Sequence, residues 1–272
     1  MLLLLTAFIF WQSGSSFFPV LLIQDAPPAP TPEEPSEVVP SEVIEQMDPE
    51  ATRLLERSLE AMGGRAARDG LISTRSIASL RMGERDTEFE LLARGDDKFL
   101  VRHTITGVGR MEIGFDGRTG WRSDPPDQQI TLISGREAAE FKKGFDFQAL
   151  LRNLDQRFTT GRIQPAEEVE GVECDVVLLE KNDERLKVLF DRETGLIRAF
   201  EPVADGDRRR RRILIEEWSR EAEPMRWVRR LRIEQPRTTV EATYSSVTFD
   251  DVADATFEAP AGIDPPEGAA TK

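Results

Sequence analysis

The sequence predicts an α+β protein in which helices cover one face of a large antiparallel sheet. Most segments after residue 70 alternate apolar and polar residues, which is typical of strands with one buried face. Asp, Asn and Gly residues separate these segments, as they do in hairpin turns. Two segments, 48–64 and 135–158, instead space apolar residues three and four positions apart, which predicts helices.

Composition separates the first 47 residues from the rest of the chain. Residues 1–24 hold two apolar runs and predict a signal peptide or an N-terminal membrane anchor. Because no basic residue precedes the first run, a start site further upstream is the alternative. Residues 25–47 are rich in Pro and Glu and predict a disordered linker. The folded domain is therefore expected over 48–262, followed by a tail at 263–272.

Residues 48–64 predict the first helix of this domain. Asp48 and Pro49 are residue types preferred at the N-cap and at the first helical position, and Gly63 and Gly64 end the segment. The apolar residues of this helix share one face, so we expect the helix to lie on another element.

The first half of the sheet is predicted between residues 72 and 133. The alternating segments are 72–82, 87–93, 99–105, 111–115 and 129–133. Asp116 to Gly120 has the composition of a turn, and it returns the chain through Trp121. Successive short strands of this kind predict an antiparallel meander with one apolar face.

The second half of the sheet follows a helical segment. Apolar spacing over 135–158 predicts one or two helices, with Gly144 as the break. Residues 170–200 then predict three strands, which polar turns at 182–184 and 191–195 separate. The remaining strands are predicted at 213–218, 226–234 and 238–249.

The composition argues against several functions. The net charge at pH 7 is −14, whereas nucleic-acid binding would need a basic surface. Cys174 is the only cysteine, which excludes an intrachain disulfide and a Cys-based zinc site. Asp250, Asp251 and Asp254 lack the spacing of an EF-hand loop, so we interpret them as a solvated turn. We expect no metal and no cofactor.

The only histidine, His103, decides whether catalysis is expected. A Ser-His-Asp or Cys-His mechanism would have to use it. It alternates with Phe99, Val101 and Ile105 on a face predicted to be apolar, so we interpret it as an interior or cavity-edge residue. We therefore expect no catalytic residue and no enzyme. The five arginines at 208–212 would suit anionic lipid headgroups, but a solvated loop is the simpler interpretation.

Several segments resemble motifs of the LolA/LolB-like superfamily, which comprises outer-membrane lipoprotein-sorting and related lipid-binding proteins. They occur in the order of the family and lie at 61–64, 115–121, 169–177 and 190–196, with a last strand ending at 254–260. The resemblance covers residues 48–262. It implies an incomplete, strongly curved antiparallel β-barrel with helices covering the open side, and an apolar cavity for acyl chains.

The resemblance also implies a function in the bacterial cell envelope. The protein would be periplasmic, either exported or tethered to the outer face of the inner membrane. It would bind, and on this interpretation transport, lipid or lipoprotein acyl chains, with a membrane surface or an envelope protein as further partners. The alternative is an envelope sensor or protein-interaction domain that uses the same concave face.

The alternating apolar residues give the candidate site. The candidates for the lining of a lipid cavity are Phe89, Leu91, Phe99, Val101, His103, Met111, Ile113, Phe115 and Trp121. The candidates on the lid helices are Leu54, Leu55, Leu59, Phe141, Phe145 and Leu150. An ordinary filled core between sheet and helices would use the same residue types, so both interpretations remain open.

Overall fold

The computed structural model describes residues 46–95, 97–126, 128–182, 184–203, 211–220, 224–236 and 238–260. The predicted leader, nearly all of the predicted linker and the predicted tail lie outside this described part, as does most of the five-arginine run. The unit that contains the described residues begins at Gln46.

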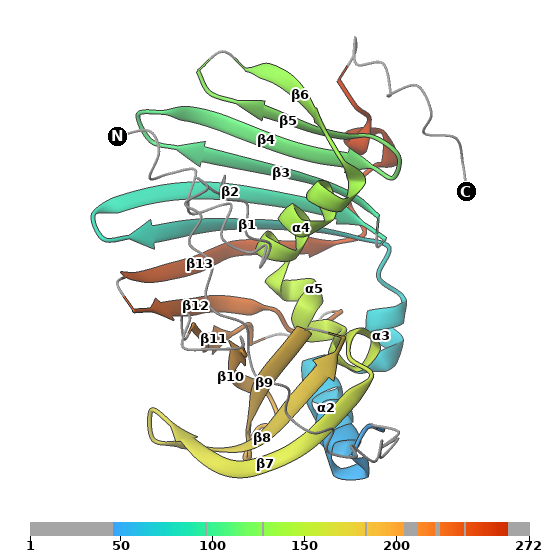
Figure 1. Cartoon of the computed structure of the whole chain (residues 1–272), viewed down its shortest axis with the longest axis vertical. Helices are drawn as coiled ribbons and strands as arrows, with labels where there is room; N and C mark the ends of the chain where they lie inside the picture. Colours follow the sequence, from blue (N-terminus) through green and yellow to red (C-terminus); the bar gives the residue numbers. More distant parts are fainter. Residues whose placement is uncertain are drawn as a thin grey trace, which may run out of the picture. The chain divides into compact units, whose positions relative to one another are not determined.

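All strands of the described part join one antiparallel sheet of thirteen strands (Figure 1). In sheet order they are β6 (Gln129–Ile133), β5 (Gly120–Asp124), β4 (Gly109–Asp116), β3 (Lys98–Ile105), β2 (Arg85–Arg94), β1 (Ser73–Met82), β13 (Thr238–Phe249), β12 (Val228–Gln235), β11 (Arg212–Trp218), β10 (Ile197–Pro202), β9 (Glu184–Asp191), β8 (Val172–Lys181) and β7 (Thr160–Val169). The edge strands β6 and β7 are not paired with each other, so the sheet is an open, curved half-barrel. This confirms the predicted fold class.

Short helices cover one face of this sheet. They are α2 (Pro49–Met62), α3 (Arg65–Asp69), α4 (Gly135–Phe145), α5 (Phe147–Arg152) and α6 (Leu154–Arg157), and a 3-10 helix, η2 (Asp254–Phe257), follows the last strand. Helix α4 packs on β3, β4 and β5, whereas α2 packs on β7 and α6. We call the side of the sheet under α4 and α5 the helix-covered face, and the opposite side the outer face (Figure 1).

No helix in the described residues is both long enough and apolar enough to cross a membrane.

Helix α2 begins and ends where the sequence predicts. The Asp48 carboxylate accepts a hydrogen bond from the backbone N–H of Glu50 at 2.7 Å. Gly63 ends the helix with φ 132°, and a Cβ at this position would lie 2.8 Å from the carbonyl oxygen of Pro224. Glycine is therefore needed there for both its backbone angle and its lack of a side chain.

Two turns with the same residue pattern are also as predicted. Asp116 accepts hydrogen bonds from the backbone N–H groups of Arg118 and Thr119 at 2.7 and 2.6 Å, which closes the β4–β5 turn. Asp191 accepts one from the N–H of Glu193 at 2.8 Å in the β9–β10 turn. Short aspartate side chains stabilise turns in this way because they replace a backbone acceptor.

The segment 135–158 differs from its prediction in two respects. It forms three short helices instead of one or two, and the break lies at Asp146 instead of Gly144. The Asp146 carboxylate accepts a hydrogen bond from the N–H of Ala149 at 2.9 Å and so begins helix α5. A capping carboxylate, not a weak helix former, therefore sets the boundary.

The sequence predicted that the last strand would end at 254–260; it ends at Phe249 instead, and residues 254–257 form η2. Phe257 of η2 is buried against the outer face of β2, β3 and β5. Its cluster contains Leu92, Leu100, Trp121 and Val252. The Asp-rich turn before η2 ends the sheet so that one aromatic side chain covers this small apolar patch.

A second buried apolar cluster lies on the outer face of β8 to β11. Its members are Val169, Cys174, Val176, Leu189, Ala199 and Leu214. Phe200, the next residue along β10, points to the helices instead and packs on Phe147 of α5. The β7–β8 hairpin curls over the outer face, and its turn residue Glu170 forms ion pairs with Arg198 of β10 and Arg232 of β12. The sheet therefore covers part of its own outer side.

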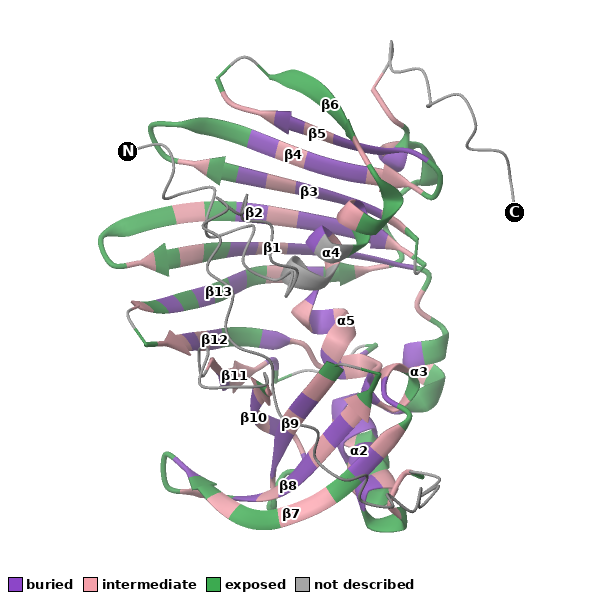
Figure 2. Cartoon of the chain, viewed as in Figure 1, coloured by how far each residue is buried: buried purple, intermediate pink, exposed green. Residues whose placement is uncertain are grey.

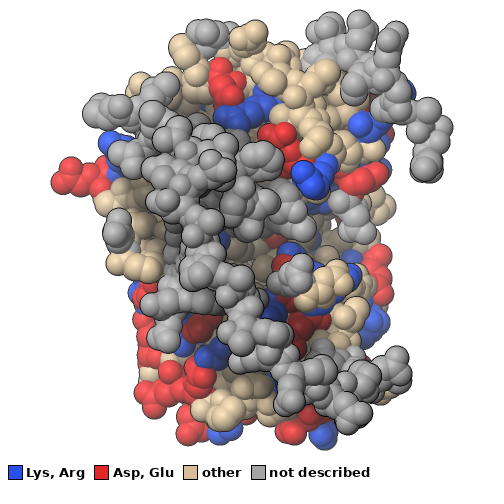
Figure 3. Space-filling model, viewed as in Figure 1, with Lys and Arg blue, Asp and Glu red and all other residues tan. Residues whose placement is uncertain are grey.

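Charged side chains elsewhere on the outer face pair across neighbouring strands. Glu90 of β2 accepts hydrogen bonds from Arg75 of β1 at 2.7 Å and from Arg102 of β3 at 2.9 Å. Burial alone would raise the pKa of Glu90, but these two hydrogen bonds lower it. Basic and acidic side chains are interspersed among the described residues in Figure 3. The charged side chains on the face shown are thus mixed in sign.

Candidate functional site

Strand pairing aligns most of the predicted lining residues in three neighbouring rows across the helix-covered face. The rows are Phe89–His103–Met111, Leu91–Val101–Ile113 and Ala93–Phe99–Phe115 on β2, β3 and β4. All of these residues are buried except Phe115, which is half-buried. Buried positions gather in the centres of these strands, whereas the hairpin tips are exposed (Figure 2). We call this set the three-row patch.

Trp121 lies on the other side of the sheet. It pairs with Gly114, which lies between Ile113 and Phe115 on β4 and therefore faces the opposite side of the sheet. The Trp121 side chain thus points to the outer face. A Cβ at Gly114 would overlap the Trp121 ring, and only glycine leaves room for the indole. The turn after Asp116 determines this placement. It sets Gly120 opposite Phe115, so the next residue, Trp121, lies opposite Gly114 and not in the three rows.

His103 lies within the first row, between Phe89 and Met111. Its Nε2 lies 3.0 Å from the hydroxyl of Thr87, and the residue is 8 % exposed. Burial lowers the pKa of His103, which favours the neutral imidazole. Cys174 belongs to the outer-face cluster and is therefore on the opposite side of the sheet. Among the described residues, no group of three His, Cys, Asp or Glu side chains is placed to hold a metal ion.

The candidate lid residues fall into two groups. Phe141 of α4 is buried beside the three-row patch, where α4 packs on β3 to β5. Leu55 and Leu59 of α2 are buried and Leu54 is half-buried, but α2 packs on β7 and α6 instead. Leu150 of α5 is half-buried. Phe145 ends α4, and its side chain lies outside the described part of the structure.

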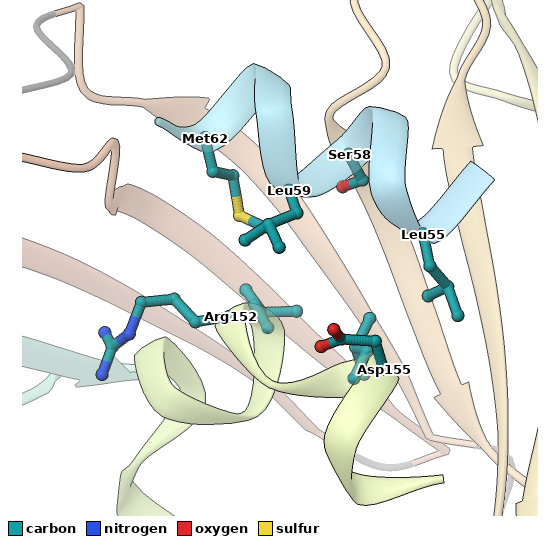
Figure 4. A pocket seen from close by; sticks show the side chains of 8 residues that line it. Leu55, Ser58, Leu59, Met62, Arg152 and Asp155 are labelled. Atoms are coloured by element: carbon teal, nitrogen blue, oxygen red, sulfur yellow. The ribbon is translucent and has the colours of Figure 1, made fainter. Parts of the chain in front are cut away.

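A small pocket lies between α2 and the helices α5 and α6 (Figure 4). It is lined by Leu55, Ser58, Leu59, Met62, Leu151, Arg152, Leu154 and Asp155. Its volume of about 10 Å³ is close to what one water molecule occupies. In this closed arrangement the pocket has no room for an acyl chain.

An ion pair holds the helices around this pocket together. Arg68 of α3 is 5 % exposed and donates to the Asp155 carboxylate of α6 at 2.6 Å. It also donates to Asp69 at 2.8 Å, and Arg65 lies 3.5 Å from Asp155. Burial alone would lower the pKa of Arg68, but the hydrogen bonds to Asp155 and Asp69 raise it. The guanidinium thus stays charged while it ties α3 to α6.

Sequence reasoning missed two polar residues, Tyr244 and Arg152. Tyr244 of β13 pairs with Ala78, which pairs with Phe89, so the tyrosine extends the first row of the three-row patch. Its ring meets the ring of Phe89 edge-on, with centroids 5.8 Å apart. Arg152 of α5 is half-buried and lines the small pocket beside α2. The sequence contained one signal for Tyr244. It lies two residues after Ala242, so both side chains face the helix-covered side of the sheet.

The comparisons with known proteins support the fold. No known family model matches the sequence, and no curated protein sequence is significantly similar to it. One similar solved structure is a DUF1329 family protein from Desulfovibrio piger ATCC 29098, with 16 % identity, a TM-score of 0.53, and coverage of 76 % of this chain and 96 % of that one. Another is a LolA superfamily protein from Nitrosomonas europaea, with 14 % identity, a TM-score of 0.52, and coverage of 77 % and 97 %. The chain therefore has the same half-barrel fold as a LolA superfamily protein, as its sequence motifs predicted.

Proposed function

We propose that this protein binds the acyl chains of a lipid or a lipoprotein on its helix-covered face, without catalysis. The observation that carries the proposal is the three-row patch, a continuous apolar surface across three strands under a short helix. Transfer of an acyl chain from water to such a surface is favourable by about 0.8 kcal/mol for each methylene buried. The LolA superfamily fold agrees with this use, although a fold alone does not fix a function.

Helix α4 is the element that would move to admit the chain. It packs on β3, β4 and β5, where Ala138 lies beside Gly120 and the Phe141 ring lies 6.0 Å from the Arg122 guanidinium. The break at Asp146 separates α4 from α5, so α4 can swing away while α5 and α6 stay attached to α3. A ligand chain would then replace Ala138 and Phe141 over the rows.

Binding of the neutral dye N-phenylnaphthylamine tests this function, because its fluorescence rises in apolar surroundings. Val101→Phe fills the middle row, whereas Val176→Phe is a matched control on the outer face; both valines are nearly fully buried. Each change should cost about 1–3 kcal/mol of stability through overpacking. Only Val101→Phe should abolish dye binding. Equal binding by both variants, or no binding by the natural protein, would contradict the proposal.

We also propose that the domain at 48–262 works in the bacterial envelope, carried there by residues 1–24 and held at a distance by the linker at 25–47. The composition of these segments supports the proposal. Fractionation of bacterial cells that produce the chain with and without residues 1–24 tests it. The full chain should be found with the envelope fraction and the truncated chain with the cytoplasm; the same location for both would refute it.

A further inference from the structure

Strand β6 is one of the two edges of the sheet, and no described strand pairs with its free side (Figure 1). The strand is exposed along most of its length (Figure 2). Ile130 is 39 % exposed and Leu132 is 41 % exposed, and they are two of the four exposed large apolar residues in the described part of the chain. An unpaired edge presents a row of backbone N–H and C=O groups, which is a template for another strand.

The sequence of β6 has none of the features that usually protect a strand edge. Natural edge strands carry charged side chains, proline or a bulge, because these features prevent pairing with another chain. Strand β6 reads Gln-Ile-Thr-Leu-Ile, without a charge or a proline, and its register with β5 is regular. Three of its five residues are β-branched, which favours strands. The free edge of β6 can therefore accept a further strand.

The opposite edge of the sheet, β7, is protected in several ways. It contains Pro165, and its register with β8 shifts between Gln164 and Glu167. Its start is covered, because Met47 forms a parallel bridge with Gly161 and helix α2 packs on the strand. Pairing of β6 with β7 of another copy would therefore meet a blocked edge. Of the two edges of this sheet, β6 alone is open along its length.

Strand register decides which chemistry a partner strand must bring to β6. Leu132 lies opposite Trp121, so Leu132 and Ile130 face the outer side of the sheet. Thr131 lies opposite Arg122, which in turn lies opposite Ile113 of the three-row patch, so Thr131 faces the helix-covered side. The partner strand must therefore be uncharged and carry apolar side chains on one face. A second copy of β6 meets both requirements.

We propose that two copies of this chain pair antiparallel through β6 and so form one continuous sheet. In the register centred on Thr131, which uses the whole strand, Ile130 lies opposite Leu132 of the second copy and the two threonines lie opposite each other. Apolar pairs and Thr–Thr pairs are both favourable across strands, and no like charges meet within the two strands. The proposal does not depend on acyl-chain binding.

The symmetry and the size of this contact determine its properties. Antiparallel strands related by a two-fold axis present the same face on the same side, so the helix-covered faces of both copies would adjoin. A contact of two five-residue strands buries less than the roughly 800 Å² per partner that is typical of stable complexes. We therefore expect a reversible dimer whose population depends on protein concentration.

Sedimentation velocity of the full chain tests the inference. Between about 1 and 300 μM, the range in which small contacts dissociate, we expect the average mass to rise from that of a monomer to that of a dimer. Amide hydrogen exchange of the peptide that covers residues 129–133 should slow over the same range, because the free backbone groups of β6 become hydrogen-bonded.

Variants assign the contact to β6. Leu132→Lys and, separately, Ile130→Lys should each raise the dissociation constant of the dimer by about tenfold or more, because lysine protects strand edges and each change enters a symmetric contact twice. Val108→Lys is the matched control. Val108 is 44 % exposed and lies in the turn between β3 and β4, away from the edge, so this variant should dimerise as the natural protein does. Residues 1–24 are common to all variants and do not affect the comparison.

Three results would overturn the inference. A natural protein that stays monomeric over the whole concentration range would refute the dimer. A dimer that Leu132→Lys, Ile130→Lys and Val108→Lys weaken equally, or not at all, would refute the assignment to β6. Slow exchange of residues 129–133 in a monomer would show that another segment of the same chain covers the edge. In each case the dye-binding test of the proposed function would be unaffected.

Discussion

The single histidine is the one side chain whose ordinary pKa lies near neutral pH. Burial in the first row lowers the pKa of His103 below its ordinary value of 6.5. The unfolded chain therefore takes up a proton at a higher pH than the folded chain does. Stability from this group is fully present above about pH 6.5 and is lost as the pH falls through the lowered pKa.

Replacement of this residue should remove that dependence. In His103→Gln, we expect the free energy of unfolding to change less between about pH 7.5 and pH 5 than in the natural protein. Urea titrations at the two pH values measure the difference. A steeper loss of stability in the variant would show that His103 does not titrate in this direction.

The thiol of Cys174 reports on the outer-face cluster. Burial, assisted by the negative charge of Asp191, raises the pKa of Cys174 to about 11. At pH 8 only about one thiol in a thousand would be ionised, and it is fully buried. A disulfide reagent should therefore react slowly with the native protein and rapidly in urea. Rapid labelling without denaturant would contradict the packing of this cluster.

At the scale of elements, the β7–β8 hairpin closes over that cluster through Glu170. Hydrogen bonding to Arg232, opposed by burial, lowers the pKa of Glu170, and Arg198 donates at 2.8 Å. Glu170→Gln should speed the labelling of Cys174 by a factor of about five at most, because partly exposed ion pairs contribute little. Glu173→Gln is the control, since Glu173 lies on β8 of the same hairpin, pairs with Arg192 of the β9–β10 turn and is far more exposed. Equal rates for both variants would show that Glu170 does not hold the hairpin.

The boundary between α4 and α5 depends on the cap at Asp146. Asp146→Ala should lower the free energy of unfolding by about 1 kcal/mol, because the N–H of Ala149 loses its acceptor. Asp146→Asn keeps an acceptor oxygen and should restore most of that loss. Thermal unfolding of the two variants measures this. Equal destabilisation would mean that the carboxylate acts through its charge and not as a cap.

Elements with a local cause could be predicted from the sequence. Asp48 with Pro49, and the aspartates that open the two turns, act on backbone groups within three residues of themselves. The three rows also follow from simple alternation. The position of Trp121 could not be predicted in this way, because it depends on the register across the turn after Asp116.

The polar part of the candidate site could not be predicted for a different reason. Asp155 lies three residues after Arg152, but its carboxylate pairs with Arg68, which is distant in sequence. A buried tyrosine hydroxyl likewise looks the same in sequence whether or not an acceptor lies beside it. Competition between side chains for the same hydrogen-bond or ion-pair partner leaves no periodic pattern in the sequence.

At the scale of the whole molecule, the sheet consists of two meanders, β1 to β6 and β7 to β13. They are joined by one pairing, that of β1 with β13, in which Thr74 lies opposite Phe249. Across this junction, Tyr244 of the second meander meets Phe89 of the first edge-on.

That junction has a consequence for how the protein is made. The strand in the middle of the finished sheet is the last one to leave the ribosome, so the first meander must wait with the inner edge of β1 unpaired. Pairings between such distant parts of a chain form slowly, and open strand edges attract other chains in the meantime. The inner edge of β1 therefore stays open to aggregation until β13 is synthesised and pairs with it.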